Sequence, residues 1–210
     1  MKGVFVTGIG TEVGKTVVSA ILVELLGADY WKPIQAGDLD FSDSDRVKSW
    51  ISNTDSIIHP EAYRLRTPAS PHHSAELDNI EIELEDFTLP DSNRPLIVEG
   101  AGGLQVPLNY TDTMLDLIHY LNLPVVLVSR NYLGSINHTM LSIESLLHRN
   151  VQIKGIVFNG DPVPSTENII LKHFKLPVIG RVPQTERIGP DIIQEHTGKF
   201  DRELLLPPFQ

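Results

Sequence analysis

The sequence contains no cysteine, which excludes disulfides, thiolate metal sites and cysteine nucleophiles together. Long apolar runs are also missing: residues 123–128, among the longest, fall far below the roughly 18 residues that a membrane span needs. The first ten residues are too weakly apolar to form a secretory signal. A formal net charge of −10 without any basic cluster disfavours binding to nucleic acid. We therefore expect a cytoplasmic enzyme or ATPase whose partners include neither nucleic acid nor a membrane.

The sequence does contain short, β-branched apolar runs that alternate with helical patterns over its 210 residues, a length that fits one domain. Strands are expected at 3–7, 29–34, 95–100, 124–129, 153–159 and 176–182, and helices at 15–27, 44–52, 112–121, 134–149 and 164–174. Continuous apolar strands separated by helices predict a doubly wound, mostly parallel sheet with helices on both faces. Residues 1–210 are expected to form this single domain, with an irregular insertion around 53–94.

A glycine-rich stretch, VTGIGTEVGKT, follows the first expected strand and opens the first expected helix. This context is typical of a phosphate-binding loop, in which Lys15 would reach the β- and γ-phosphates and Thr16 would ligate Mg²⁺. Five residues separate Gly8 from Gly14, one more than in the usual spelling. The added length would carry Thr11 and Glu12 into the mouth of the site. Glu12 is then either the neighbour of an amine-bearing partner or a solvated carboxylate in a turn.

Polar residues that follow the other strands form a second group of candidates, because ligands gather at the carboxyl ends of parallel strands. Lys32 precedes a proline, which favours an extended backbone at the strand end, and a lysine there would stabilise a transferring phosphoryl group. Asp45 and Glu99 are candidate Mg²⁺ ligands. The alternatives are a helix cap for Asp43 or Asp45 and a buried ion pair for Glu99. The eight histidines show no metal-binding spacing.

Several motifs, taken in order, resemble the dethiobiotin synthetase family over nearly the whole chain. They are VTGIGTEVGKT, WKPIQAG, SPHHSAE, IVEGAGGLQVPL, LGSINHTMLSIESLL, GIVFNG and RVPQTERI. The resemblance implies a fold of the P-loop NTPase type, related to the nitrogenase iron protein and the partitioning ATPases. It also implies an ATP-dependent ligase of biotin biosynthesis. In that reaction 7,8-diaminononanoate takes up CO₂ as a carbamate, ATP phosphorylates the carbamate, and the second amine closes the ureido ring.

The resemblance also assigns roles to individual residues. Lys32 corresponds to the catalytic lysine, with Thr11 and Lys15 beside the transferring phosphate, and Mg²⁺ would be held by Thr16, Asp45 and Glu99. The implied ATP-binding residues are Gly8, Glu12, Val13, Gly14, Lys15, Thr16, Val17, Glu99, Gly100, Ala101, Gly102, Asn159, Gly160, Pro183, Gln184 and Thr185, of which Asn159 would contact adenine. The implied substrate-binding residues are Thr11, Lys32, Ala36, Gly134, Ser135, Ile136 and Asn137. The last four begin a helix that would bind the substrate carboxylate across the interface of a homodimer.

Two departures from the family pattern affect these expectations. Ala36 stands where the family usually has serine or threonine, so a hydroxyl contact to the substrate is missing. Gln184 stands where a larger apolar residue is common, and Gly160 is followed by Asp161, which bears on the choice of base. Neither departure removes a phosphate or metal ligand.

Two other functions share parts of this pattern. A switch ATPase of the partitioning type carries an early lysine in the loop, K-G-G-x-G-K-[ST], and this chain has Gly10 there. An amide-forming enzyme of the cobyrinate type normally adds a glutaminase domain with a cysteine nucleophile, and this chain has no cysteine. Both remain alternatives at this stage.

Overall fold

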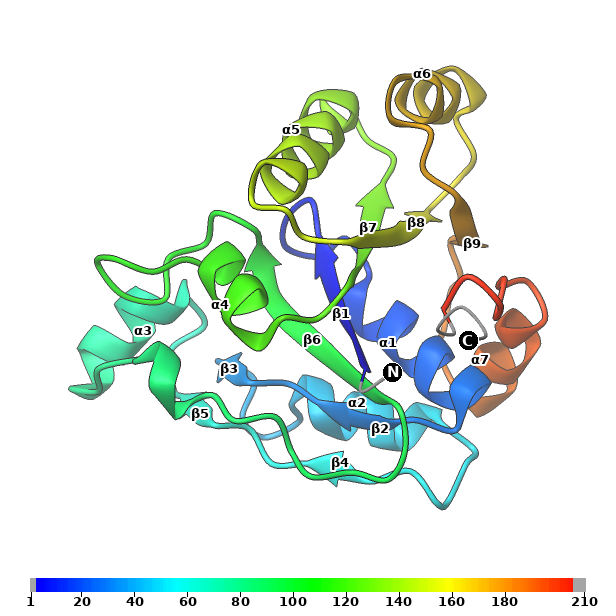
Figure 1. The fold of residues 1–210 in the computed structure, drawn as a ribbon. Helices are drawn as coiled ribbons and strands as arrows, with labels where there is room; N and C mark the ends of the chain where they lie inside the picture. Colours follow the sequence, from blue (N-terminus) through cyan, green and yellow to red (C-terminus); the bar gives the residue numbers. More distant parts are fainter. Residues whose placement is uncertain (1–2, 206–210) are drawn as a thin grey trace.

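The computed structural model describes residues 3–205 and contains a central sheet whose strands all pair in parallel (Figure 1). Within the described residues, seven strands form this sheet in the spatial order β4-β2-β6-β1-β7-β8-β9. They are β1 (Gly3–Gly8), β2 (Asp29–Trp31), β4 (Ile58–His59), β6 (Leu96–Gly103), β7 (Val125–Arg130), β8 (Ile153–Asn159) and β9 (Val178–Val182). A short second sheet pairs β3 (Ile34–Ala36) with β5 (Tyr63–Leu65), also in parallel.

Helices lie on both faces of the sheet because the chain winds away from β1 in two directions (Figure 1). Right-handed crossovers toward β2 place α1 on one face, and crossovers toward β9 place α4, α5 and α6 on the other. Helix α1 packs against α2 and α7, and α5 packs against α6. The helices are α1 (Lys15–Leu26), α2 (Asp43–Trp50), α3 (Pro71–Asp78), α4 (Met114–Leu121), α5 (Ser135–His148), α6 (Pro164–Phe174) and α7 (Pro190–Thr197), with a 3₁₀ turn at Leu84–Asp86.

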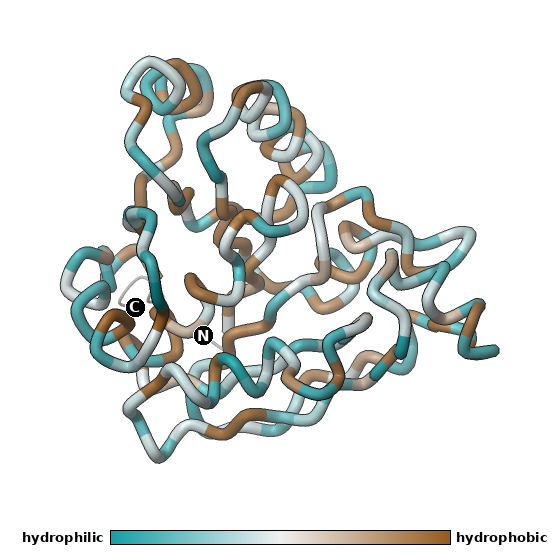
Figure 2. Tube along the Cα trace, turned by 180° about the vertical axis from the view of Figure 1, so that it is seen from behind, coloured by the Kyte–Doolittle hydropathy of each residue, from teal (hydrophilic) through white to brown (hydrophobic). Residues whose placement is uncertain are grey.

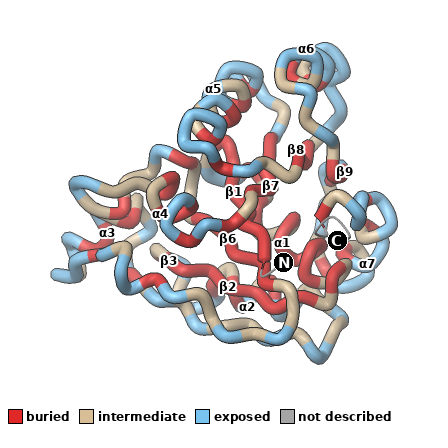
Figure 3. The backbone as a smooth tube through the Cα atoms, viewed as in Figure 1, coloured by how far each residue is buried: buried red, intermediate tan, exposed pale blue. Residues whose placement is uncertain are grey.

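The hydrophobic core is centred on the strands, which run through the buried middle of the molecule (Figure 3). All six residues of β1 are buried, as are the first five of β7. Apolar residues concentrate on the same central segments, whereas the outer turns are mainly hydrophilic (Figure 2). Strands covered on both faces need continuous apolar sequences, which is why the short apolar runs marked them correctly. Among residues 3–205, no helix is long and apolar enough to cross a bilayer.

The observed sheet confirms the expected fold class and corrects several local boundaries. The strand expected at 29–34 breaks at Lys32 and Pro33, and its second half leaves the main sheet to pair with β5. The strand expected to end near Glu99 continues to Gly103 through an irregularity beside β1. The insertion at 53–94 supplies β4, an edge strand of the main sheet, as well as β5 and α3. Helix α7, which the sequence analysis did not predict, packs on α1.

This topology determines where a ligand site can form. Strand β1 lies between β6 and β7, and the chain winds in opposite directions from these neighbours, so a crevice opens at their carboxyl ends. The loops after β1, β2, β6, β7 and β8 all emerge along this edge. The candidate residues identified from the sequence lie mainly in these loops.

Candidate active site

The loop between β1 and α1 has the geometry of a phosphate-binding loop. Helix α1 begins at Lys15, directly after Gly14, which has a positive φ of 96°. A Cβ at Gly14 would lie 2.2 Å from Nδ2 of Asn159, so no other residue fits there without displacing that side chain. Lys15 is 7% exposed, and its Nζ donates a hydrogen bond of 2.9 Å to the carbonyl of Gly10. The lysine therefore curls back over the loop, in position to meet an incoming phosphate.

Burial changes the titration of Lys15. Desolvation lowers the pKa of Lys15 to about 8, assisted by the nearby charge of Lys32 and opposed by Glu99 and Asp43. A bound polyphosphate would restore a pKa well above this value. Free protein would then lose the proton above pH 8 and the complex would keep it, so the affinity for ATP is expected to fall as pH rises, by up to about tenfold per pH unit.

Calorimetry at pH 8.5 in two buffers of different ionisation enthalpy measures this coupling directly. We expect ATP binding to take up protons, and the Lys15→Met variant to show no such uptake. Binding to the native protein without proton uptake would contradict the lowered pKa of Lys15.

A buried polar cluster lies behind the phosphate loop and is centred on Glu99 of β6, which is 1% exposed. Oε1 of Glu99 accepts a hydrogen bond of 2.8 Å from Thr16 Oγ1, and Oε2 accepts one of 3.0 Å from the hydroxyl of Tyr30. Burial, followed by the charges of Glu99 and Asp43, raises the pKa of Tyr30 well above its usual value, so the phenol remains a donor. Each carboxylate oxygen of Glu99 is therefore held in a fixed direction.

Lys32 joins this cluster to the start of α2. Its ammonium group is 3.3 Å from Oε1 of Glu99 and forms a short ion pair with Asp43. Burial lowers the pKa of Lys32, but the charges of Glu99 and Asp43 outweigh this effect and raise the pKa above its usual value. Burial opposes ionisation of Asp43 as well, yet Lys32 lowers the pKa of that carboxyl group below its usual value. Lys32 is thus a buried, charged lysine, not a solvated one.

The acidic residue beside Glu99 is Asp43, whereas the sequence analysis selected Asp45. The Asp45 carboxylate forms a capping box with Ser42, whose backbone N–H and hydroxyl donate to its Oδ2 at 2.9 and 2.8 Å. Those hydrogen bonds lower the pKa of Asp45, which lies exposed at the start of α2. Two residues along a helix point about 200° apart, so only one of this pair can face the sheet. The structure thus shows Asp45 in the capping position that was the alternative, and it places Asp43 beside Lys32 and Thr16.

The donor set around Thr16 fits a magnesium ion that also binds nucleotide phosphates. The Thr16 hydroxyl contacts the carboxylates of both Asp43 and Glu99, so three oxygen-bearing side chains of the kind that Mg²⁺ prefers lie together, each on a different element. No group of three or more acidic, histidine or cysteine side chains that could hold a metal alone occurs in the part of the chain that the structure describes. Such a partial set is typical of Mg²⁺, which usually keeps phosphate and water ligands.

The residues expected to contact the base lie along the neighbouring edge, where β8 and β9 end. Asn159 Nδ2 donates a hydrogen bond of 2.7 Å to the carbonyl of Val13, which ties this edge to the phosphate loop. The N–H of Gly160 donates to the carbonyl of Val182 at 2.9 Å. The segment 183–185, with Pro183 and Gln184 exposed, therefore begins beside Gly160. Asn159, Gly160 and the segment 183–185 are therefore neighbours in the structure.

The glycine run of β6 closes the opposite side of the phosphate loop. A Cβ at Gly103 would lie 3.4 Å from the Cα of Gly10, and a Cβ at Gly102 would lie 3.6 Å from the hydroxyl of Thr11. Gly102 and Gly103 therefore approach the loop closely, and Thr11, which is exposed, lies beside Gly102. Gly100 lies farther back, against Phe5 and Met114. Val17 lies in the first turn of α1, and Ala36, partly buried, ends β3.

The helix start expected to bind a carboxylate is separate from this cluster within one chain. Gly134 caps α5 with a φ of 101°, Ser135 is buried, and Ile136 and Asn137 are exposed. Within residues 3–205, no hydrogen bond joins this segment to Lys32 or to the phosphate loop. Leu133, immediately before it, is fully exposed at 103%. The segment is therefore exposed, and within the described residues it has no direct hydrogen bond to the site of its own chain.

Sequence reasoning missed two residues of the site, and their positions explain why. Tyr30 lies two residues before Lys32, so the two share one face of an extended chain, a signal that was available. Arg130 ends β7, and its Nη1 donates a hydrogen bond of 3.1 Å to the carbonyl of Glu12. Glu12 has a positive φ of 57°, which is uncommon for a residue other than glycine. Only the fold brings Arg130 to the loop.

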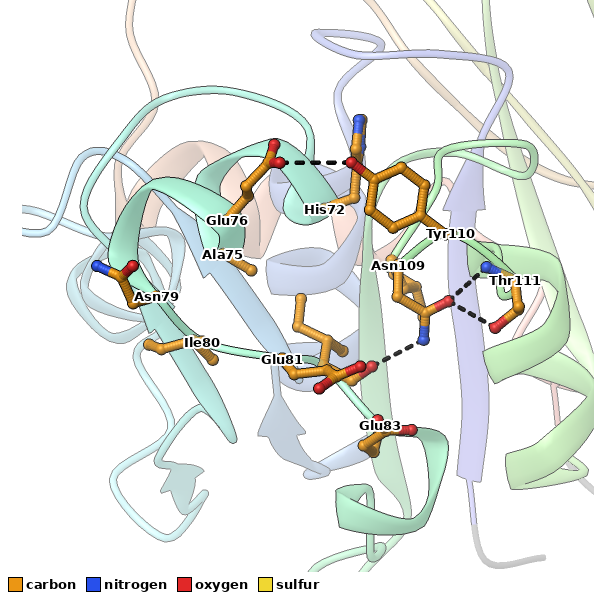
Figure 4. A pocket seen from close by; sticks show the side chains of 12 residues that line it. His72, Ala75, Glu76, Asn79, Ile80, Glu81, Glu83, Asn109, Tyr110 and Thr111 are labelled. Carbon is orange, nitrogen blue, oxygen red and sulfur yellow. Dashed lines mark hydrogen bonds between the residues drawn. The ribbon is translucent and has the colours of Figure 1, made fainter.

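A pocket of about 430 Å³ lies apart from these residues, at the edge of the insertion (Figure 4). Its wall is formed by α3, the segment 79–83 and the loop 108–111. Tyr110 points toward Glu76, with 3.4 Å between its hydroxyl and Oε1, and Asn109 Nδ2 donates to the carbonyl of Ile82 at 2.8 Å. None of the expected site residues lines this pocket. We therefore do not assign the active site to it.

Comparisons with known proteins agree with this geometry. A family model described as an AAA domain matches residues 2–191. The ATP-dependent dethiobiotin synthetase of Christiangramia forsetii is 51% identical, covering 97% of this chain and 98% of the relative. The corresponding protein of Cytophaga hutchinsonii is 48% identical, covering 95% of this chain and 97% of the relative.

Solved structures extend the comparison at the level of the fold. The cell division ATPase MinD of Pyrococcus furiosus superposes with a TM-score of 0.56 at 13% identity, covering 95% of this chain and 98% of that chain. The septum site-determining protein MinD of Pyrococcus horikoshii, complexed with Mg-ADP, gives 0.53 at 13% identity, covering 94% and 86%. At this identity the match establishes the fold alone.

The parallel sheet and its loop between β1 and α1 define a P-loop nucleotide-binding protein. Within that class, the buried Lys32, Asp43 and Glu99 cluster beside the loop indicates an enzyme that acts on phosphate. The identity to the two synthetases over almost the full length is decisive for the family. The chain belongs to the dethiobiotin synthetase family.

Proposed function

We propose that this chain catalyses the ATP- and CO₂-dependent ring closure of 7,8-diaminononanoate to dethiobiotin, a step of biotin biosynthesis. The observation that carries the proposal is the charged Lys32 held between two carboxylates behind an intact phosphate loop, in a chain 51% identical to a dethiobiotin synthetase. The relatives' names favour this ATP-dependent ligase over a switch ATPase or a cobyrinate-type enzyme. The expected cytoplasmic location remains a prediction.

The reaction has three bond-forming steps. One amine of the substrate attacks CO₂, forming a C–N bond and releasing a proton, which gives a carbamate. A carbamate oxygen then attacks the γ-phosphorus of ATP, and ADP leaves. The second amine attacks the carbonyl carbon of this mixed anhydride and forms the second C–N bond of the ureido ring. The C–O bond to phosphate breaks, phosphate leaves, and the attacking nitrogen gives up one proton while keeping the other as the ureido N–H. The protein's main task is to position the reactants and neutralise the phosphoryl group.

The residues of the cluster suit these tasks. Lys15 and the loop N–H groups would bind the β- and γ-phosphates, while Lys32 would stabilise charge on the transferring phosphoryl group. Thr11, exposed at the mouth of the loop, would lie beside the carbamate. Ala36 offers only a methyl group, so the substrate would lack a hydroxyl contact at that position.

Magnesium is proposed as the cofactor, held by Thr16, Asp43 and Glu99 together with phosphate oxygens. When bound, the ion would neutralise charge on the β- and γ-phosphates. The fixed hydrogen bonds of Glu99 to Thr16 and Tyr30 support the assignment, because they orient the carboxylate toward the same point.

We also propose that the protein acts as a homodimer in which the start of α5 reaches the site of the partner subunit. Exposed apolar side chains support this arrangement. Leu133 precedes α5, and Ile136, Leu141 and Leu147 lie along it, with exposures of 103, 37, 53 and 50%. Apolar residues concentrated on one element favour a protein interface, and a twofold dimer is the commonest arrangement. A helix N-terminus with free N–H groups suits a substrate carboxylate.

The function is tested by the dependence of ATP turnover on the diamine. Purified protein with ATP, Mg²⁺, bicarbonate and 7,8-diaminononanoate should release phosphate in a one-to-one ratio with ureido product, because each ring closure consumes one phosphoryl transfer. Phosphate release and product mass are measured in the same sample. Equal ATP turnover without the diamine would instead support the switch ATPase.

A further inference from the structure

A second buried carboxylate, Glu167, lies outside the cluster described above and pairs with the half-exposed Arg181. Glu167, in the first turn of α6, is only 4% exposed. Its Oε2 accepts two hydrogen bonds from Arg181 of β9, from Nε at 3.1 Å and from Nη2 at 2.8 Å. Arg181 also lies over the ring of Phe158, 5.7 Å from its centroid. A buried carboxylate with this many partners is costly unless every partner is kept.

The other oxygen of Glu167 connects the same group to the loops at the sheet edge. Oε1 accepts hydrogen bonds from Nδ2 of Asn131 at 3.2 Å and from the N–H of Val163 at 3.3 Å. Asn131 Nδ2 also donates to the carbonyl of Asp161 at 3.0 Å. The N–H of Asn131 donates to the carbonyl of Asn159 at 3.2 Å. Glu167 therefore ties together the loops that follow β7 and β8 and the end of β9.

These loops are the ones that border the expected base site. Asn159 and Gly160 lie immediately before the segment that Asn131 and Glu167 hold, and Arg181 lies two residues before Pro183. Glu167 itself is buried on the α6 side, beneath these loops. Among the described residues, the Glu167 side chain makes no hydrogen bond to the phosphate loop, and the link between them runs through Asn131 and Asn159, whose side chain donates to the carbonyl of Val13. A change at Glu167 should therefore act first on the base site and only weakly on the phosphate site.

We propose that Glu167 is a positioning residue that holds the base-binding edge of the nucleotide site in its binding geometry through Arg181 and Asn131. It sets the affinity for the nucleoside part of ATP without touching the nucleotide. The proposal rests on the proposed function only in taking Asn159, Gly160 and residues 183–185 as the base site. This role would explain why a carboxylate is buried at Glu167, a residue that takes no part in the proposed ring closure.

The test compares ATP with inorganic tripolyphosphate, a ligand that has the phosphates and no base. In the Glu167→Gln variant, Oε1 can still accept from Asn131 and Val163, but the charge facing Arg181 is lost. We expect the Kd for ATP to rise on the order of tenfold, as for the loss of hydrogen bonds to a charged group, and the Kd for tripolyphosphate to change less than about twofold. Both are measured by calorimetry with Mg²⁺ and without the diamine.

Two further variants make the result interpretable. Asn131→Ala keeps the Arg181 ion pair and removes the link to Asp161, so it should weaken ATP binding in the same selective way. Glu195→Gln removes the carboxylate of an exposed ion pair with Lys199 on α7 and should change neither affinity. Thermal unfolding of each variant establishes that it is folded at the temperature of measurement.

In turnover assays we expect the KM for ATP to rise in the Glu167→Gln variant and kcat to stay within about twofold, since chemistry occurs at the other end of the nucleotide. Equal weakening of ATP and tripolyphosphate would show a general structural role and overturn the proposal, as would unchanged ATP binding in both Glu167→Gln and Asn131→Ala. These measurements need no diamine, so they test the role of Glu167 independently of ring closure. The role of Glu167 can be refuted in a protein that closes the ring, and it can be supported in one that does not.

Discussion

Replacing Lys32 with methionine should lower turnover by about 10²- to 10³-fold, the usual cost of losing one preorganised group that stabilises transition-state charge. Burial opposes the charge of the ammonium group, but Glu99 and Asp43 outweigh it and raise the pKa of Lys32, which favours the charged form. Methionine has a similar length but removes both the charge and the hydrogen bonds that Lys32 donates to Asp43 and Glu99. The measurement is kcat and KM for ureido product formation, together with the Kd for ATP.

We expect the Kd for ATP to change much less than kcat, because Lys15 and the loop N–H groups supply most of the contacts to the phosphates. The matched control is Lys48→Met, which changes an exposed lysine in the last turn of α2 and should leave turnover unaffected. If Lys32→Met retained native turnover, Lys32 would serve only to neutralise the two carboxylates, and its catalytic role would be wrong.

Asparagine at position 43 and at position 45 should give opposite results. Asp43→Asn removes one of the two carboxylates that face Thr16, so we expect the Mg²⁺ concentration for half-maximal turnover to rise on the order of tenfold or more, about 1.4 kcal/mol of lost binding free energy. Asp45→Asn should leave this concentration unchanged. It should lower the free energy of unfolding by about 0.3–1 kcal/mol, since a negative charge is lost from the first turn of α2.

The two variants are compared by Mg²⁺ titration of turnover and by urea unfolding. They lie on the same helix, two residues apart, and make the same chemical change, so each is the control for the other. The reverse outcome, with the Mg²⁺ requirement altered by Asp45→Asn alone, would restore Asp45 as the ligand and contradict the geometry at the start of α2.

Most of the fold was predictable because local signals and tertiary structure agree. Strands buried on both faces must be continuously apolar, and the glycine-rich turn before α1 needs the backbone freedom that Gly14 supplies. The break after β2 was not predicted. Lys32 and Pro33 interrupt an otherwise apolar run, and the pairing of β3 with β5 depends on a segment about 30 residues away.

The site residues could be predicted where a motif fixes the backbone geometry. The prediction failed where the role of a residue depends on the direction of its side chain. Lys15, Thr16 and the loop follow from their spacing alone. The choice between Asp43 and Asp45 depended on recognising Ser42 as the N-cap of α2, because its spacing places Asp45, and not Asp43, at the capping-box position. Partners contributed by distant strands, such as Glu167 with Arg181, leave no local signal at all.

The hydrogen bond from Arg130 to the carbonyl of Glu12 spans 118 positions of the sequence and holds a residue in an uncommon backbone conformation. Two proteins with the identical string VTGIGTEVGKT could therefore differ in how well the loop is formed, depending on what ends their β7. A substitution far outside the motif could weaken nucleotide binding without changing a letter of it. An intact signature is therefore evidence of common ancestry. The ability of the loop to bind nucleotide also depends on the residue at the end of β7 that holds it in place.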